Sequence, residues 1–388
     1  MKQQVQKVIL ISDKGGAQFE LWKIMAKKAS EYGWRLFNLS LSNGWVPKNI
    51  SPIGAIINYP SPHPTVEHMK KIGCPIIRLG NYPHPDDDII PAIMNNSAAF
   101  GKLGATHFYE RGFSTVGYIA NSPFSLGKHI YEAFKDQSRE YGLDCHLLGL
   151  TLEDNSSSEK FESLSNQIEI WLNSLPKPIG IMTYSNKMAA RLSYVCMTKG
   201  WAIPEDISIL GIGNNSFYCE TAAVDLSSIE TDTEEYGNKA IELLNKHIKG
   251  QAPKSPIKIE PKGITVRHST DVYAVKDPKV KKALGLIRDK YNSILTIDDI
   301  AKHSELNRRT LERAFKKNLG QAPNVILRQK RLEKSQHLLA STNQSISVIS
   351  NLVGMGNKLN LHRAFKEHYG ITPGDYRKEL KKGSLQKQ

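Results

Sequence analysis

Two nearly identical decapeptides carry the side chains of this chain whose chemistry is easiest to interpret. LERAFKKNLG (311–320) and LHRAFKEHYG (361–370) lie fifty residues apart and share Leu, Arg-Ala-Phe-Lys and Gly. In each copy the Leu and the Phe are one helical turn apart and predict a buried face, so the Arg and Lys side chains face outward. A guanidinium group can donate in a fork to guanine, and an ammonium group binds phosphate as a point charge. The repeat therefore predicts two helices that bind nucleic acid.

Each decapeptide follows a predicted helix and a short turn. Thr296 and Ser345 are candidate N-caps of the first helix of each unit, and Asn307 and Asn357 can cap the second helix. A helix, a turn of a few residues and a basic helix make a helix-turn-helix unit. For a single stretch of this kind, a small bundle with a solvated basic surface is an equal alternative. The repetition of both the apolar positions and the basic face favours two reading units.

The segment between the two units, PNVILRQKRLEKSQHLLA (323–340), predicts one continuous helix. Pro323 suits the first helical position, and Val325, Leu332 and Leu339 recur every seven residues. A helix of this length spans roughly 27 Å, which approaches the ~34 Å between successive major-groove faces on one side of duplex DNA. A single chain is therefore expected to place both basic helices in adjacent grooves without dimerising.

Positive charge is concentrated in the last third of the chain. Residues 271–388 contain 24 Lys and Arg against 11 Asp and Glu, whereas residues 1–270 contain 28 against 27. Such a block is either a solvated tail or a surface for polyanions. Its regular apolar spacing argues against a tail, so double-stranded DNA is the expected partner.

Other classes of function have little support. The sequence contains no HExxH, GxSxG, Walker or GxGxxG motif, so we expect no enzymatic activity and no cofactor. The four cysteines lack metal-type spacing and are expected to be reduced core residues. The apolar runs are far shorter than the ~20 residues of a membrane span, and the N-terminus reads as a first strand rather than a secretory signal. A cytoplasmic protein is therefore expected.

The residues from Asp277 to Leu380 resemble the DNA-binding module of AraC/XylS-type transcription factors. The likeness rests on TIDDIAKHSELNRRTLERAFKKNLG, RLEKSQHLL and SISVISNLVGMGNKLNLHRAFKEHYGITPGDYR. That family has two helix-turn-helix units joined by a helix, and it reads base edges from outward positions early in each recognition helix. The resemblance implies the following base-reading residues: Arg309, Glu312, Arg313, Lys358, Leu359, His362 and Arg363.

Further basic side chains of the same helices are expected to bind phosphates, which sets affinity rather than sequence choice: Arg308, Lys316, Lys317 and Lys366. The chain departs from the family pattern at two places. Glu305 occupies a turn position that usually holds Gly, and Leu359-Asn360-Leu361 replaces an aromatic-rich run. We expect the first departure to loosen its turn and the second to leave base reading by the second unit less defined.

Residues 1–270 alternate short apolar runs with helical stretches. VILIS, GAIINY, PIIRLG, TVGYIA, IGIMTY and ISILGI are continuous apolar runs, which predict parallel strands covered on both faces. A segment of this length favours two lobes with a ligand cleft at the carboxyl ends of the strands. The expected fold is an α/β, two-lobed sensor with parallel sheets, followed by an all-α domain with two helix-turn-helix units.

The stretches GWAIPEDISILGIGNN and LSSIETDTEEYGNKAIELL are similar to the effector-binding core of lactose-repressor-type regulators, which are relatives of periplasmic sugar-binding proteins. Because the DNA-binding unit follows this core, the arrangement resembles that of bacterial xylose-operon regulators, whose core binds D-xylose. The resemblance implies a periplasmic-binding-protein-like sensor, a small-molecule effector such as a sugar and a homodimer formed through the first lobe. We expect an effector-binding domain at 1–271, a linker at 272–279 and a DNA-binding domain at 280–388.

The expected ligand residues are mostly neutral. Sugar-binding cores commonly place carboxylates after two of these strands, because a carboxylate accepts two hydroxyl hydrogen bonds. This chain instead has Asn after IGIMTY and after ISILGI, and Asn96 stands where Asp is usual. The candidate set is Asp13, Phe124, His129, Asn186, Asn214 and Asn215, with Phe217 as a further cleft residue. A neutral cleft indicates a ligand other than xylose, or a DNA-binding regulator whose sensor has lost its ligand.

Overall fold

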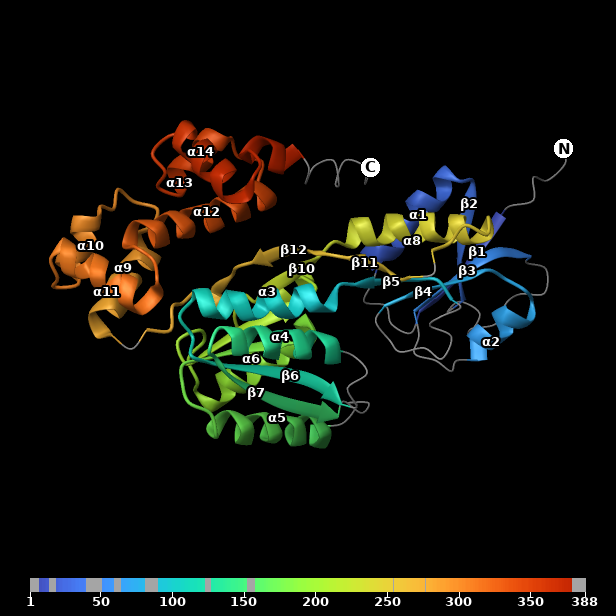
Figure 1. The fold of residues 1–388 in the computed structure, drawn as a ribbon, viewed down its shortest axis with the longest axis horizontal. Coiled ribbons are helices and arrows are strands. Elements are labelled where there is room, and N and C mark those ends of the chain that lie inside the picture. Colours follow the sequence, from blue (N-terminus) through green and yellow to red (C-terminus); the bar gives the residue numbers. More distant parts are fainter. Residues whose placement is uncertain are drawn as a thin grey trace.

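The computed structural model of the chain describes residues 7–13, 19–39, 51–58, 64–80, 90–122, 127–151, 158–253, 255–275 and 277–378. Two α/β lobes lie next to each other, and a helical region extends from the second lobe, at the end of the molecule away from the first lobe (Figure 1). This confirms the predicted fold class. In the described part of the chain, no helix has the length and apolar character that a membrane crossing requires.

The first lobe is a parallel sheet with the strand order β11-β5-β4-β3-β1-β2 among the described strands. The strands are β1 (Lys7–Asp13), β2 (Trp34–Asn38), β3 (Pro52–Asn58), β4 (Ile76–Leu79), β5 (Ala92–Asn95) and β11 (Ile257–Ile259). The helices are α1 (Phe19–Glu31), α2 (Pro64–Lys71) and α8 (Thr233–Ile248). Met25 of α1 and Leu244 of α8 pack against Ile56 of β3, and all three are buried. Helices distant in sequence thus share one face of this sheet.

The second lobe has the order β12-β10-β9-β8-β6-β7, and β12 alone among its described strands is antiparallel. The strands are β6 (Thr115–Ser122), β7 (Asp144–Thr151), β8 (Ile179–Thr183), β9 (Ile207–Ile212), β10 (Ser227–Thr231) and β12 (Pro261–Thr265). The helices are α3 (Ser97–Glu110), α4 (Lys128–Glu140), α5 (Ser158–Asn173), α6 (Asn186–Lys199), α7 (Ser216–Glu220) and the 3₁₀ turn η3 (His268–Thr270). In Figure 1 the arrows of β6 and β7 point toward the first lobe, so the carboxyl ends of these strands face it.

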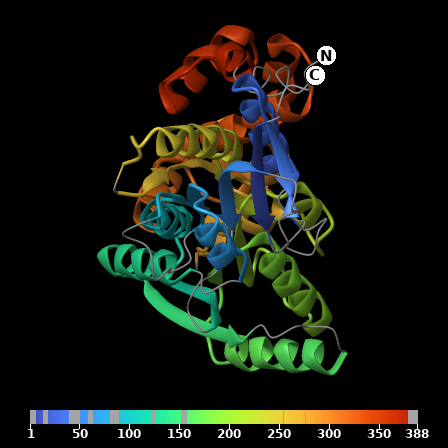
Figure 2. The ribbon, with the colours of Figure 1, turned by 90° about the vertical axis from the view of Figure 1, so that its right-hand side faces the viewer.

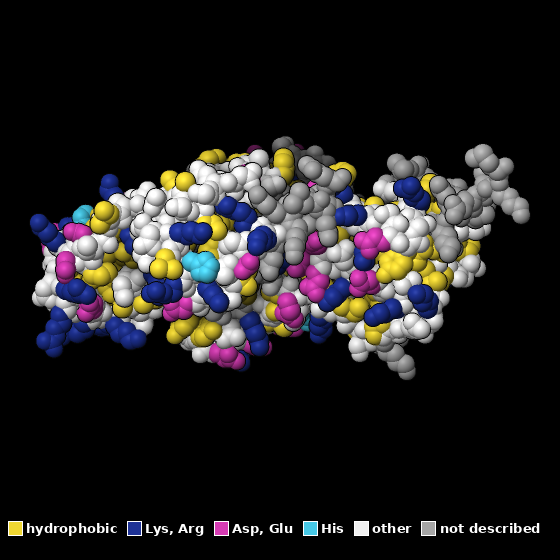
Figure 3. Space-filling view, turned by 90° about the horizontal axis from the view of Figure 1, so that it is seen from above, with side chains coloured by type: hydrophobic (Ala, Val, Ile, Leu, Met, Phe, Trp, Pro, Cys, Tyr) yellow, Lys and Arg dark blue, Asp and Glu magenta, His cyan; other side chains and the backbone are white. Residues whose placement is uncertain are grey.

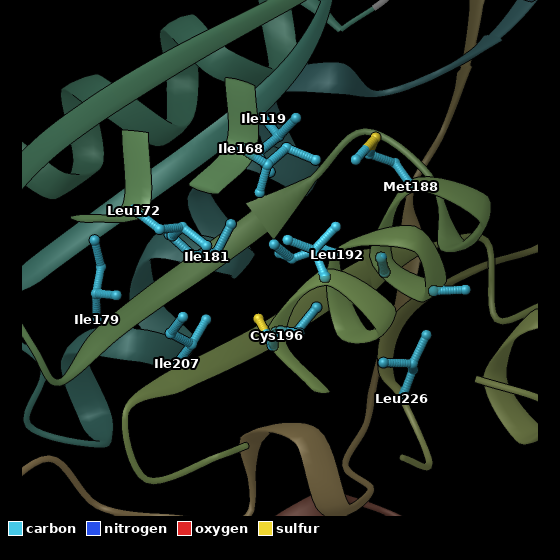
Figure 4. Packing of buried hydrophobic residues seen from close by; sticks show 14 of the residues in the cluster. Ile119, Ile168, Leu172, Ile179, Ile181, Met188, Leu192, Cys196, Ile207 and Leu226 are labelled. Carbon is cyan, nitrogen blue, oxygen red and sulfur yellow. The ribbon is translucent and has the colours of Figure 1, made fainter. Parts of the chain in front are cut away.

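Both faces of the second sheet are covered. Every residue of β8 is buried. Ile181 joins the cluster formed with α5 and α6, which includes Leu172 and Leu192 (Figure 4), and its neighbour Met182 joins the cluster formed with α3 and α4. Burying each such side chain stabilises the fold by about 1.5–3 kcal/mol. The continuous apolar run IGIMT therefore does what the sequence predicted for a central parallel strand.

Three segments cross between the lobes in the described residues: β5 to α3, β10 to α8, and β11 to β12. At the crossing, the backbone N–H of Asn96 donates to the carbonyl of Ile259 (2.8 Å), and its side-chain amide donates to Glu260 Oε1 (2.6 Å). Asn96 therefore links two of the crossing segments. Asn96, which stands where related cores usually have Asp, thus connects two segments at the boundary between the lobes.

The helical region contains α9 (Pro278–Lys290), α10 (Ile297–His303), α11 (Arg308–Leu319), α12 (Pro323–Ser341), α13 (Ile346–Leu352) and α14 (Lys358–Tyr369). We call α10 and α11 the first head, α12 the rod, and α13 and α14 the second head. The second head projects above the lobes in two perpendicular views (Figures 1 and 2). The two predicted helix-turn-helix units and the predicted connecting helix are confirmed.

The rod has a different apolar face from the one that the sequence predicted. Leu332 and Leu339 are buried, but Val325 is 46% exposed. Ile326 and Leu327 are buried in its place, because the start of the rod packs against the first head and its end packs against the second. A strict seven-residue repeat describes a helix with one partner along its whole length, whereas the rod has two.

The predicted linker is a packed segment. Val272 and Ala274 lie against the core of the second lobe, whereas Tyr273 and Val275 lie against the core of the first head. Alternate side chains of an extended segment point to opposite sides, so residues 272–275, which we call the strap, contact two cores at once. Asp277 then caps α9, and the predicted domain boundary within 272–279 stays a prediction.

Candidate DNA-reading surface and effector cleft

The first head is assembled from strong local signals. Thr296 Oγ1 accepts from the N–H of Asp299 (3.1 Å), and the Asp299 carboxylate accepts from the N–H of Thr296 (2.9 Å). This reciprocal capping box starts α10. Asn307 accepts from the N–H of Thr310 (2.8 Å) and starts α11. Leu311 and Phe315 are fully buried, so the opposite face of α11 must point to solvent.

The predicted base-reading and phosphate-binding residues of the first head all lie on that exposed face: Arg308, Arg309, Glu312, Arg313, Lys316 and Lys317. Arg308 Nε donates to Glu312 Oε1 (3.0 Å), one helical turn away, and Lys316 Nζ donates to the carbonyl of Gly320 (2.8 Å). Exposed pairs of this kind contribute only about 0–1 kcal/mol. They can therefore exchange for DNA groups at little cost, although contact with DNA by these residues stays a prediction.

The second head repeats the plan. Ser345 accepts from the N–H of Val348 (3.2 Å) at the start of α13, and Asn357 accepts from the N–H of Asn360 (2.9 Å) at the start of α14. Leu361 and Phe365 are fully buried. The predicted base-reading residues Lys358, Leu359 and Arg363 and the predicted phosphate contact Lys366 are exposed, and the predicted base-reading residue His362 is half-buried. Leu359 is 65% exposed, which suits contact with a thymine methyl group.

The turns of the two heads each contain a residue with a left-handed backbone, but the residue type differs. Glu305 has a φ of +57° and Gly354 has a φ of +73°. Glycine adopts this left-handed conformation without cost, whereas other residues lose roughly 1–2 kcal/mol. Lys282 Nζ lies 2.6 Å from Glu305 Oε1, and Lys279 Nζ donates to its carbonyl oxygen (3.3 Å). The departure predicted to loosen this turn is thus held in place by two lysines of α9.

The two heads are also joined by contacts that the sequence pattern did not predict. Arg331 of the rod donates from Nε to the carbonyl of Tyr291 (2.7 Å) and from Nη2 to the carbonyl of Ser293 (3.0 Å), just before the first head. Gly354 lies so close that a Cβ there would sit 2.4 Å from the Tyr291 oxygen. Arg328 also pairs with Glu367 of α14. These contacts fix the second head relative to the first.

A groove of about 420 Å³ runs between the heads. Its lining includes three arginines, Arg328, Arg331 and Arg363, of which Arg363 is a predicted base-reading residue. Figure 3 shows Lys and Arg side chains gathered at the end of the molecule occupied by the helical region. Positive charge at this end is the electrostatic condition for binding a phosphate backbone.

The predicted ligand asparagines form a network among themselves. The Asn186 amide donates to Ser228 Oγ (2.9 Å), and its Oδ1 accepts from the N–H of Asn215 (3.0 Å). Ser228 Oγ also accepts from the N–H of Asn214 (2.9 Å), and Asn215 caps α7. The structure brings these three residues together after β8 and β9, as predicted, but it gives Asn186 protein partners on both amide atoms. Ligand contact by the three residues stays a prediction.

The other candidate ligand residues do not join this network. His129 lies on α4 with its side chain 74% exposed and 3.0 Å from Glu132, and Phe217 is 66% exposed. Asp13 is the last residue of β1, and its side chain lies outside the described residues. Phe124 lies outside them altogether.

Three polar atoms in the described part of the second lobe are buried without a hydrogen-bond partner, and two of them belong to residues outside the predicted ligand set, Tyr118 and Asn121. Among the described residues, Tyr118 Oη, Asn121 Oδ1 and Asn214 Oδ1 are buried and have no hydrogen-bond partner. Burial raises the pKa of the Tyr118 phenol, which is therefore neutral. A buried polar atom without a partner costs about 1–3 kcal/mol, which a hydroxyl-bearing ligand could recover. Tyr118 and Asn121 lie within a run that the sequence identified only as a strand.

Two protein-family models match separate parts of the chain. A periplasmic binding protein-like domain matches residues 105–270, and a helix-turn-helix domain matches residues 300–379. The first match covers the second lobe through η3, and the second match covers both heads and the rod. The order of the two matched domains agrees with the order of the lobes and the helical region in the structure.

Relatives and solved structures extend the likeness over most of the chain. The xylose operon regulatory protein of Haemophilus influenzae is 26% identical over 336 residues, which is 84% of each protein, and that of Escherichia coli is 26% identical over 80% of each. A solved structure of the xylose-binding transcription activator xylR covers 97% of this chain and 99% of that chain, with a TM-score of 0.60 and 21% identity. The chain therefore carries a periplasmic binding protein-like domain followed by an AraC-type helix-turn-helix domain, and it is homologous to the xylose operon regulatory proteins.

Proposed function

We propose that the chain is a sequence-specific, DNA-binding transcription regulator whose DNA affinity responds to a small neutral molecule, a sugar or related polyol, bound between the lobes. The observation that carries the DNA-binding part is the pair of capped, basic recognition helices held on one rod. The rod is about 28 Å long, which suits two neighbouring major-groove faces of a single duplex. The homologous xylose operon regulators agree with this role.

The effector class follows from the neutral lining of the second lobe. Amide and phenol groups donate to and accept from sugar hydroxyls without adding charge. Such buried phenol and amide oxygens, on the side of the second lobe that faces the first lobe, belong to Tyr118, Asn121 and Asn214. The proteins named as relatives include xylose operon regulators, so xylose is the first sugar to test, followed by other pentoses and hexoses.

A regulator without an effector is the second candidate. The observation that favours it is the internal satisfaction of Asn186, whose amide has protein partners on both atoms. The two candidates differ in one measurement. A panel of monosaccharides is titrated against the full chain while its melting temperature is followed, because a ligand of the folded state stabilises it by mass action. A sugar that raises the melting temperature supports the effector, and a panel without any effect supports the second candidate.

Dimerisation through the first lobe is part of the proposal, by analogy with lactose-repressor-type cores. A dimer would present four heads to the DNA and lengthen the recognised site. Analytical ultracentrifugation at micromolar concentration tests it, and a monomer there would remove this part of the proposal. DNA binding by a single chain does not depend on the outcome, because one chain carries both heads.

A further inference from the structure

The second lobe and the rod are joined by buried charges. Arg111, the residue after α3, lies with its Nη2 atom 3.0 Å from Glu333 Oε1 of the rod, and the two side chains are only 6% and 17% exposed. Asp271, directly after η3, pairs with Lys330 of the rod, whose side chain is 7% exposed. Breaking one partner of a buried pair leaves an uncompensated charge and is strongly unfavourable. We call the Arg111–Glu333 and Asp271–Lys330 pairs the latch.

One face of the rod carries the residues that contact the second lobe. Lys330, Glu333, Lys334 and His337 recur at the three- and four-residue spacing of one helix face. Lys334 Nζ lies 3.9 Å from Asp271, and the pKa of His337 is lowered first by burial and then by the charges of Lys334 and Arg267. The sensor-facing stripe is therefore polar, whereas the faces toward the two heads are apolar.

A hydrogen-bonded chain leads from the latch into the second lobe, and its direction is fixed by chemistry. Arg111 can only donate, so its Nη1 donates to His107 Nδ1 (3.0 Å). Neutral His107 then carries its proton on Nε2 and donates to Thr270 Oγ1 (2.9 Å). Burial, followed by the Arg111 charge, holds the pKa of His107 well below its ordinary value, which keeps the ring neutral. Thr270 in turn donates to Ser227 Oγ (2.7 Å).

The hydrogen-bonded chain ends beside the network formed by Asn186, Asn214 and Asn215. Ser227 and Ser228 are consecutive residues of β10, and Ser228 accepts from both Asn186 and Asn214. A shift of β10 relative to β9 would therefore move Ser227 and Thr270 together with the network. The strap, which is residues 272–275, is itself packed between the two cores.

We propose that the latch, with the bonded chain Ser227–Thr270–His107–Arg111–Glu333, is the joint through which the effector cleft controls the position of the rod and its two heads. This inference rests on the proposed function and names its route of regulation. Arg111 and Glu333 act as positioning residues, and they touch neither DNA nor effector. A continuous series of hydrogen bonds does not by itself show that effector binding and DNA binding are coupled. The test therefore measures this coupling.

The first arm of the test needs neither DNA nor effector. Amide hydrogen exchange is measured on the full chain for wild type, Glu333→Gln and the control Glu169→Gln, which removes a half-exposed pair with Lys199 between α5 and α6. In Glu333→Gln we expect exchange to quicken about tenfold or more in residues 107–111 and 330–337, because Arg111 loses its charge partner. The control should leave these segments unchanged. Equal exchange in Glu333→Gln and wild type would overturn the latch.

The second arm measures coupling with xylose as the probe and a duplex selected from a random library. The variant Thr270→Val keeps the shape of the side chain and the latch but removes the hydroxyl between His107 and Ser227. We expect the ratio of DNA dissociation constants with and without xylose to fall toward one, while exchange at 330–337 stays as in wild type. An unchanged ratio in both Thr270→Val and Glu333→Gln would overturn the proposed joint. A wild-type ratio of one would instead overturn the xylose effector of the proposed function, and the exchange arm alone would then decide the latch.

Discussion

The first and second heads share a sequence plan but are held by different neighbours. The first head packs against α9 and the strap, so its core includes Tyr273 and Val275 from the edge of the sensor. The second head has a core made from its own helices and the end of the rod, together with Tyr376. The first head is thus anchored to the sensor, whereas the second is positioned by the rod and by the carbonyl of Tyr291.

The two turns show what this difference requires of the sequence. Two features of Gly354 require glycine. Its φ is +73°, and a Cβ there would lie 2.4 Å from the Tyr291 oxygen. Glu305 has only the first of these constraints, and it tolerates a side chain that reaches Lys282. The two copies of the motif therefore differ where the Tyr291 oxygen leaves no room for a side chain in one copy, whereas the other copy has room for one.

The largest expected effect is from Gly354→Ala. The added Cβ meets a backbone oxygen and adopts a left-handed backbone, so we expect a loss of about 2–4 kcal/mol in the free energy of unfolding. Gly356→Ala is the matched control, since Gly356 has a φ of +78° with no atom near the Cβ position, and should cost about 1 kcal/mol. Urea unfolding followed by circular dichroism measures both. Equal losses would show that the contact between the heads is unimportant.

Arg313→Ala and Lys316→Ala separate reading from phosphate binding in the first head. Arg313→Ala should cost about 1–3 kcal/mol at one base pair and relax the preference there. Lys316→Ala should weaken all sequences alike and reduce the salt slope by roughly one. Binding to duplexes with single substitutions, at several salt concentrations, measures both effects. Equal and sequence-blind losses from the two variants would contradict base reading by α11.

Acid should lower the free energy of unfolding through the buried His107. Because the pKa of His107 in the folded chain lies below its ordinary value of 6.5, the unfolded chain binds more protons near pH 6. The contribution of neutral His107 to the free energy of unfolding is therefore retained above pH 6.5. It falls as the pH drops below 6.5, by at most about 1.4 kcal/mol per pH unit. His107→Gln should have a shallower loss between pH 6.5 and 5.5 in thermal unfolding. An identical pH profile would remove His107 from this role.

The smallest expected effect is a gain. Glu305→Gly relieves a left-handed glutamate at the loss of an exposed ion pair, so we expect the free energy of unfolding to rise by about 0.5–1 kcal/mol. Glu305→Gln keeps the strained backbone and removes only the charge, and it serves as the control. Chemical denaturation compares the two variants, and a stability loss in Glu305→Gly would mean that the Lys282 pair outweighs the backbone strain.

What could be predicted from the sequence was whatever is decided locally. Asn307 and Asn357 cap their helices because a cap needs only the next three residues, and the apolar run of β8 marks a covered strand. Contacts between distant residues could not be predicted in this way. Arg111 and Glu333 lie 222 residues apart, and Asn186 finds Ser228 only after β8, β9 and β10 have aligned.

The exposure of Val325 was also missed because it depends on contacts between distant parts of the chain. The spacing of Val325, Leu332 and Leu339 correctly indicated a helix, but spacing cannot say that the partner of the helix changes halfway along it. The exposed basic faces of α11 and α14 were predictable because burial of Leu311 and Leu361 leaves only one side for the basic residues. The unpartnered phenol of Tyr118 was not predictable, because Tyr118 is one position in a strand whose neighbours decide its surroundings.

We propose that one chain places its two basic helices in neighbouring grooves of one duplex. Hydroxyl-radical footprinting on a library-selected duplex, with one bound chain per duplex confirmed by native mass spectrometry, tests it most directly. We predict two protected stretches on the same face of the DNA, separated by about one helical turn of ~10 base pairs. Protection of a single stretch, or none, would contradict it.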